Sequence, residues 1–139
     1  MKRIFVTGST GLLGGYIVEH LIRQRYQVRA LARKTSDLSH LKTTGAEIVL
    51  GDIEDYASVK HLAKDCDIAI HAAARVLPGL GQWEDFEKTI IKGTNNVLKA
   101  SIENGLKRFV YVSSGSVYGN AGTGRNNKCV DETVGYDLA

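Results

Sequence analysis

Apolar side chains in this chain occur in short continuous runs that alternate with amphipathic segments. The first run, Ile4–Val6, is apolar and partly β-branched, which is typical of a strand buried on both faces of a parallel sheet. From Leu12 the pattern becomes helical and places Leu13, Ile17 and Leu21 on one face. Four later runs predict further strands, over residues 27–32, 46–50, 67–71 and 108–113.

Helical patterns lie between these strands. The sequence predicts a short turn around Leu38 and Leu41, a helix through Val59 to Ala63 capped by Asp55, and a long helix from Trp83 to Ser101 with Gly105 as its C-cap. Residues 75–82 and 115–127 are predicted loops. Because strands alternate with helices, we expect an α/β fold: a doubly wound parallel sheet of five strands in the order 3-2-1-4-5, in three α/β/α layers.

Three glycines after the first strand suggest a ligand site. Gly8, Gly11 and Gly14 follow at three-residue intervals. Gly8 permits a tight turn, Gly11 lets the backbone approach a pyrophosphate, and Gly14 lets the helix pack close to the strand. The free N–H groups of the first helical turn and the positive end of the helix dipole would face the phosphates. This pattern predicts a dinucleotide site on a Rossmann-type sheet; a glycine turn without a ligand is the alternative.

The end of the second strand bears on which nicotinamide cofactor binds. An acidic residue at this place holds the adenosine ribose, whereas an arginine accommodates a 2′-phosphate. The acidic place falls at about Ala32, and Arg33 and Lys34 follow it. Asp37 lies too far along the chain to replace it. Since a guanidinium can hold phosphate through two parallel hydrogen bonds, Arg33 predicts NADP rather than NAD; a solvated arginine at a strand exit is the alternative.

Composition is that of an ordinary globular protein. The 139 residues suffice for one domain with a buried core, and 43% are hydrophobic and 24% charged. The net charge of +3 comes from scattered Lys and Arg. Their densest group, within residues 23–34, is interpreted as a solvated helix end and strand exit, so no nucleic-acid partner is expected.

Cys66 and Cys129 lie far apart without metal-ligand spacing, so we expect free thiols, a reducing compartment and no metal site. The first apolar run is too short for a signal peptide or a membrane span. The sequence therefore predicts a cytoplasmic protein without a membrane partner.

Two motifs resemble those of the extended short-chain dehydrogenase/reductases, which include nucleotide-sugar epimerases and dehydratases and dihydroflavonol-reductase-like enzymes. They are TGSTGLLG at Thr7–Gly14 and SSGSVYG at Ser113–Gly119. The resemblance implies hydride transfer at a carbinol or carbonyl carbon of a small-molecule substrate, either a sugar nucleotide or a carbonyl compound, and a homodimeric intact enzyme. It implies that Ser114 is the catalytic hydroxyl that holds the substrate oxygen.

The resemblance also implies cofactor contacts. It places Asp52 on the adenine amino group and the backbone N–H of Ile53 on the ring, although Asp52 could instead cap the next helix. The small residues after the fourth strand would lie beside the ribose and nicotinamide. With Arg33, the full set of predicted cofactor contacts is Thr7, Gly8, Ser9, Thr10, Gly11, Leu12, Leu13, Gly14, Arg33, Asp52, Ile53, Ala72, Ala73 and Ala74.

Two other polar residues have simpler interpretations. A lone histidine beside a buried strand is usually a satisfied core residue, so His71 is assigned no catalytic role. Serine-rich turns are common after strands, and Ser114 could simply be part of one.

The chain departs from the family pattern in two places. Ile90 stands where the family commonly has an asparagine in the long helix. The family's catalytic tyrosine and lysine form a YxxxK motif, but Tyr136 is followed by only three residues, and it is not assigned as the catalytic tyrosine. We therefore expect residues 1–139 to be the NAD(P)-binding domain, without the YxxxK helix, the last strands and the substrate domain. The fifth strand would then be an open edge.

Three functions remain compatible with these residues. The first is an NADP-dependent oxidoreductase or nucleotide-sugar epimerase or dehydratase, present as its cofactor-binding part. The second is a non-catalytic NAD(P)-binding or sensor module that is complete as written. The third is an interaction domain without a ligand, for which neither cofactor would raise the melting temperature.

Overall fold

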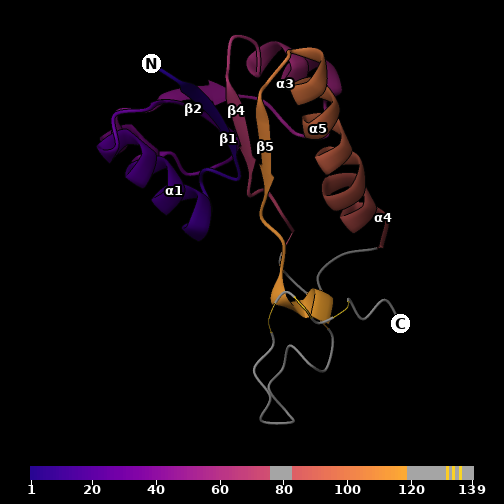
Figure 1. Ribbon diagram of the computed structural model, residues 1–139. Helices are drawn as coiled ribbons and strands as arrows, with labels where there is room; N and C mark the ends of the chain where they lie inside the picture. Colours follow the sequence, from indigo (N-terminus) through magenta and orange to yellow (C-terminus); the bar gives the residue numbers. More distant parts are fainter. Residues whose placement is uncertain (76–82, 119–130, 132, 134, 136–139) are drawn as a thin grey trace.

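The computed structural model describes residues 1–75, 83–118, 131, 133 and 135. Its centre is a parallel sheet in the order β3-β2-β1-β4-β5, which confirms the predicted fold class and strand order (Figure 1). The strands are β1 (Arg3–Thr7), β2 (Gln27–Ala32), β3 (Glu47–Leu50), β4 (Ile68–His71) and β5 (Arg108–Tyr111). The register pairs Thr7 with His71, so β1 and β4 end together.

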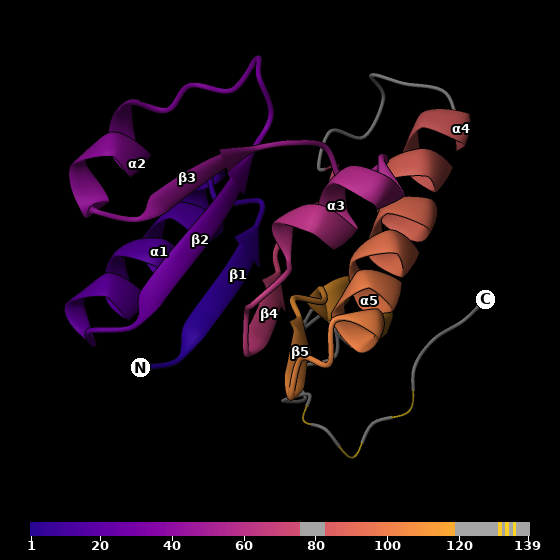
Figure 2. The ribbon, with the colours of Figure 1, turned by 90° about the horizontal axis from the view of Figure 1, so that it is seen from above.

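Helices cover both faces of the sheet (Figure 2). On one face lie α1 (Leu12–Arg23) and α2 (Ser39–Thr44). On the other lie α3 (Tyr56–Leu62), α4 (Trp83–Phe86) and α5 (Gly93–Glu103). Two separate apolar cores result because alternate residues of a strand face opposite sides. Phe5 packs into the core under α3 and α5, and its neighbours Ile4 and Val6 pack into the core under α1 and α2.

The buried face of α1 differs in part from the predicted one. Ile17 and Leu21 pack against the core, and Val18 is fully buried, but Leu13 remains 52% exposed. The reason is that Gly14 brings the first turn of α1 against Gly8, and Gly15 brings it against His40. No apolar side chain is needed to fill space there. Leu13 instead lies on the open side of the glycine turn.

The long helix of the sequence prediction is a single helical run of three parts. The π-helical turn η1 (Glu87–Lys92) joins α4 to α5, and it contains Ile90, where the family pattern has an asparagine. The run ends at Asn104, and Gly105 follows with a φ of +69°. The N–H of Leu106 donates to the Ser101 carbonyl at 2.9 Å, which closes the helix end as predicted.

Some predictions fall outside the described residues, namely those on Cys129, on Tyr136, on residues 76–82 and on residues 119–127. Within the part of the chain that is described, no helix is long and apolar enough to cross a membrane. The same residues contain no group of three or more His, Cys, Asp or Glu side chains that could hold a metal ion. Cys66 is a buried free thiol, and burial raises its pKa.

Candidate functional site

The glycine turn between β1 and α1 is built by close backbone contacts. Gly8 has a φ of +70°, and a Cβ added to it would come within 2.5 Å of the Ala72 and Ala73 backbone. A Cβ on Gly14 would come within 2.0 Å of the Gly8 carbonyl oxygen. Both residues must therefore be glycine for α1 to start directly beside β1 and β4. These contacts agree with the roles predicted for Gly8 and Gly14.

Gly11 is less crowded than Gly8 and Gly14, although it is not open. An added Cβ would meet only the Gly8 carbonyl oxygen, at 3.3 Å, and the φ of Gly11 is −81°. The first helical hydrogen bond runs from the Gly15 N–H to the Gly11 carbonyl at 2.8 Å. The N–H groups of Leu12, Leu13 and Gly14 precede that bond and have no acceptor within the helix. This cradle fits an anionic group such as a pyrophosphate.

The side chain of Thr7 faces the interior and does not face this cradle. Its Oγ1 lies 2.6 Å from Nδ1 of His71, and Nε2 of His71 lies 3.0 Å from Oγ1 of Thr94. Burial lowers the pKa of His71 to about 4, so the imidazole is neutral at pH 7. Thr7 and His71 thus tie β1, β4 and α5 together, and the interpretation of His71 as a satisfied core residue agrees with this geometry.

Ser9 is also a structural residue. It is fully buried, and its hydroxyl donates to the Leu31 carbonyl at 2.7 Å. This bond holds the glycine turn against the end of β2. Beyond it, Ala32 is buried while Arg33 and Lys34 are exposed. Any contact of Ser9 with a ligand is therefore restricted to its backbone. Arg33 lies at the exit of β2, as expected from the sequence.

The turn after β3 is held next to β2, because the Gly51 N–H donates to the Ala32 carbonyl at 3.0 Å. Asp52 accepts from the Glu54 N–H at 3.0 Å and does not cap α3. That cap is Asp55, whose carboxylate accepts from the Ser58 N–H at 3.2 Å, as predicted. The Ile53 side chain packs into the core, so only its backbone could face an adenine ring.

Ser114 lies two residues beyond the last hydrogen bond between β5 and β4, from the Val112 N–H to the His71 carbonyl. It precedes the 3-10 helix η2 (Gly115–Tyr118) and is exposed. Its Oγ accepts from the Ser116 N–H at 3.2 Å and lies 3.2 Å from the Ser116 hydroxyl. These contacts are weak enough to leave the hydroxyl accessible to a ligand, although they also describe an ordinary serine turn.

The structure brings most of the predicted contacts to one edge of the sheet, where the strands end. Leu12 and Leu13 start α1, the Ala72 N–H donates to the Thr7 carbonyl at 3.2 Å, and Ala73 and Ala74 follow it. In an open α/β sheet this edge, at the point where the strand order reverses, is where ligands bind. Asp37 is not part of the set, because it accepts from the N–H and hydroxyl of Ser39, and these hydrogen bonds lower its pKa.

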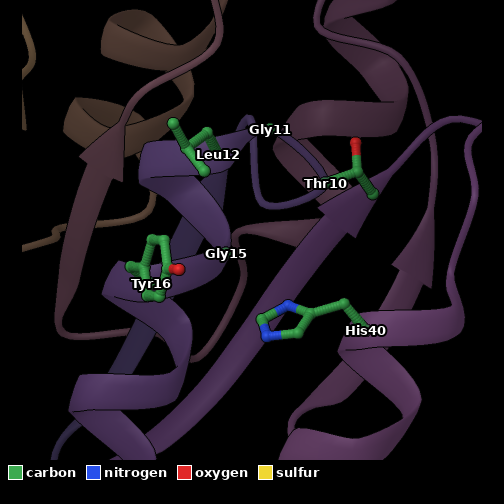
Figure 3. A pocket seen from close by; sticks show the side chains of 6 residues that line it. All are labelled: Thr10, Gly11, Leu12, Gly15, Tyr16 and His40. Atoms are coloured by element: carbon green, nitrogen blue, oxygen red, sulfur yellow. The ribbon is translucent and has the colours of Figure 1, made fainter.

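Sequence reasoning missed one feature, a pocket between α1 and α2 (Figure 3). It has a volume of about 240 Å³ and is lined by Thr10, Gly11, Leu12, Gly15, Tyr16 and His40. Tyr16 and His40 carry no motif, so no pattern pointed to them. The available signal in the sequence was the pair of adjacent glycines, Gly14 and Gly15. In the structure a Cβ on Gly15 would lie 3.2 Å from Nδ1 of His40, so the glycine there marks the close approach of α2.

Comparison with known proteins agrees with this geometry. The NAD dependent epimerase/dehydratase family matches residues 4–138. A sterol-4-alpha-carboxylate 3-dehydrogenase (decarboxylating) from Dictyostelium discoideum is 34% identical over 94% of this chain, and cinnamoyl-CoA reductase 1 from Oryza sativa subsp. japonica is 30% identical over 84%. The matched regions are 40% and 36% of those two proteins, so the chain spans well under half of their length.

A solved structure shows the same fold. The UDP-glucose 4-epimerase from Stenotrophomonas maltophila, with bound NAD and formylated UDP-arabinopyranose, superposes with a TM-score of 0.84 at 26% identity. It covers 100% of this chain, and this chain covers 44% of it. With the family match extending over nearly all residues, the chain belongs to the NAD-dependent epimerase/dehydratase family.

Proposed function

We propose that residues 1–139 form the NADP-binding domain of an oxidoreductase or nucleotide-sugar epimerase or dehydratase. The observation that carries this proposal is the glycine turn. Gly8 and Gly14 are required by the protein's own packing, whereas an added Cβ at Gly11 would meet a single atom, the Gly8 carbonyl oxygen, beside N–H groups that have no acceptor within the helix. A turn that packing holds against β4, with free N–H groups beside its least crowded glycine, suits a pyrophosphate.

The preference for NADP rests on Arg33. Its side chain follows the buried Ala32 at the exit of β2, beside the turn that Ser9 ties to Leu31. The nearest acid along the chain, Asp37, is engaged with Ser39. An exposed guanidinium at this point can hold a 2′-phosphate in a bidentate manner.

When bound, the nicotinamide would supply a hydride acceptor or donor. The chain's own contribution to the chemistry would be Ser114, whose hydroxyl can donate to or accept from a substrate oxygen as its charge changes. Asp52 and the Ile53 backbone would hold the adenine, and Ala72, Ala73 and Ala74 would line the nicotinamide side. The substrate would be a sugar nucleotide or a carbonyl compound.

The cofactor preference is tested by reversing the charge at Arg33. The affinity of Arg33→Asp for NADPH should fall by about tenfold to a hundredfold relative to its affinity for NADH, measured by calorimetric titration of both cofactors. Lys64→Asp is the matched control, because it makes the same charge change before β4, at the opposite edge of the sheet. If the ratio of the affinities for NADPH and NADH were unchanged in Arg33→Asp, the assignment to NADP would be wrong.

The site itself is tested at Gly11. The Cβ of a valine there would meet only the Gly8 carbonyl oxygen, at 3.3 Å, so Gly11→Val should fold with a small loss of stability and lose binding of both cofactors. Circular dichroism would report the fold and titration the binding. Retained binding would mean that the pyrophosphate does not lie on this turn.

We also infer that the intact enzyme is a homodimer that uses the outer face of the long helix. Ile91, Leu98 and Ile102 recur there at helical spacing, and Ile102 is 69% exposed. Such a row of exposed apolar side chains on a helix is typical of a protein–protein interface.

A further inference from the structure

The turn between β3 and α3 is held by a side chain of the long helix. Asn96, on α5, donates through Nδ2 to the Ile53 carbonyl at 2.9 Å and to the Glu54 carbonyl at 3.2 Å. Two acceptors at one atom fix the orientation of this amide, because its oxygen would be repelled there. Figure 2 shows α3, into which the turn leads, beside α5. Asn96 therefore fixes the backbone of a segment that lies 43 positions earlier in the chain.

The bond from Asn96 acts on the same peptide group that orients Asp52. The Ile53 carbonyl and the Glu54 N–H belong to one planar peptide group and point in opposite directions. Asn96 holds the carbonyl end, and the N–H end donates to Oδ1 of Asp52 at 3.0 Å. A rotation of this peptide group would break both hydrogen bonds together. Asn96 thus sets the direction of the Asp52 carboxylate through one rigid group.

Two further contacts join the turn to the long helix. Oγ1 of Thr89, in η1, donates to Oε1 of Glu54 at 2.7 Å. Gly93 packs so closely on Ile53 that an added Cβ would lie 2.7 Å from Ile53 Cδ1. The Ile53 side chain is anchored in this way, and the position of its backbone follows from the position of the helix.

A second asparagine of the same helix shows what a purely structural tie looks like. Nδ2 of Asn104 donates to the Lys60 carbonyl of α3 at 2.8 Å. Both asparagines thus hold the backbone of the neighbouring segment through a side-chain amide. Only Asn96 does so at the residues proposed to hold the adenine, Asp52 and Ile53.

We propose that Asn96 is a positioning residue for recognition of the adenine base. This inference rests on the proposed function, since it deepens the adenine contacts assigned there to Asp52 and Ile53. Adenine offers an amino donor to a carboxylate and a ring nitrogen acceptor to a backbone N–H. Without the Asn96 amide the peptide group after Ile53 is free to rotate, and the carboxylate loses the direction that this pairing needs.

The test compares NADPH with reduced nicotinamide hypoxanthine dinucleotide phosphate, in which the base presents an oxygen and an N–H at the same two places. In calorimetric titrations the unmodified protein should bind NADPH about tenfold more tightly than the analogue. In Asn96→Ala this preference should fall to about threefold or less, because the affinity for NADPH decreases while that for the analogue changes by less than about twofold. Asn96→Gln, which keeps the amide on a longer side chain, should restore part of the preference.

Asn104→Ala is the matched control, because it removes the same kind of bond from the same helix. Its melting temperature should fall by a similar amount to that of Asn96→Ala, and its preference for adenine should be unchanged. Repeating the titrations with NADH and its hypoxanthine analogue makes the result independent of Arg33.

Equal weakening of both dinucleotides in Asn96→Ala would indicate a purely structural role and overturn the inference. An unchanged preference in Asn96→Ala, or the same loss of preference in Asn104→Ala, would also overturn it. If the unmodified protein bound neither NADPH nor NADH, the proposed function would fail as well. If it bound them without any preference for adenine, the glycine turn would stand, whereas this inference and the role of Asp52 would fail.

Discussion

At the scale of single residues, two glycines with the same backbone conformation have different reasons to be glycine. Gly8 and Gly45 have φ values of +70° and +82°. An added Cβ at Gly8 would come within 2.5 Å of the backbone of Ala72 and Ala73, which cannot move without shifting β4, whereas nothing lies within 4 Å at Gly45. Only Gly8 combines backbone strain with a steric clash.

We therefore predict that Gly8→Ala lowers the free energy of unfolding by about 3 kcal/mol or more, and that Gly45→Ala lowers it by about 1 kcal/mol. The second variant controls for the positive φ alone. Urea denaturation followed by circular dichroism measures both. Equal losses in the two variants would show that the approach of the turn to β4 is looser than the contacts imply.

His71 makes stability depend on pH. Its pKa of about 4 in the folded protein lies below the value of 6.5 for an unperturbed imidazole. Between these values the unfolded chain binds a proton that the folded protein does not, so stability is full above pH 6.5 and falls as the pH decreases toward 4.

The loss expected from His71 over that range is about 2–3 kcal/mol, measured as the free energy of unfolding in urea at a series of pH values. His71→Gln should reduce the slope between pH 6.5 and 4, whereas His61→Gln, at an exposed position, should retain it. A slope that survives in His71→Gln would assign the pH dependence to other groups.

At the scale of elements, α3 depends on the residue that precedes it. Asp55 caps the helix through the Ser58 N–H, and α3 has no acidic residue in its first turn to replace it. Asp55→Ala should therefore lower the free energy of unfolding by about 1 kcal/mol, and Asp55→Ser, which keeps a capping oxygen, by much less. Thermal unfolding of the three proteins compares them, and equal losses in both variants would contradict the cap.

At the scale of the whole molecule, the outer face of the long helix, from η1 through α5, tests the proposed dimer. If the intact enzyme is a homodimer through Ile91, Leu98 and Ile102, a charge at Ile102 would be buried without a partner. Ile102→Glu should then shift the protein toward the monomer in size-exclusion chromatography with light scattering. Lys42→Glu, on α2 across the sheet, is the exposed control. A dimer that persists in Ile102→Glu would place the interface elsewhere.

Much of this architecture could be predicted because it is encoded locally. The run Ile4–Val6 and the three glycines that follow specify a strand, a tight turn and a helix within one short segment. Asp55 could be recognised as a cap from its position before a helical pattern. The boundaries differ by one or two residues, as at β5, which ends at Tyr111 and not at residue 113.

The sequence by itself determined the alternation of strands and helices, their parallel order and the glycine turn, since each depends on the spacing of residues close together in the chain. Only the tertiary structure decided that the side chain of Thr7 contacts that of His71, 64 residues later in the chain. It also decided that the Ser9 hydroxyl donates to the Leu31 carbonyl and that the His40 ring lies against Gly15. These contacts join separate elements, and their geometry follows from how α1, α2 and the strands pack, which no local pattern records.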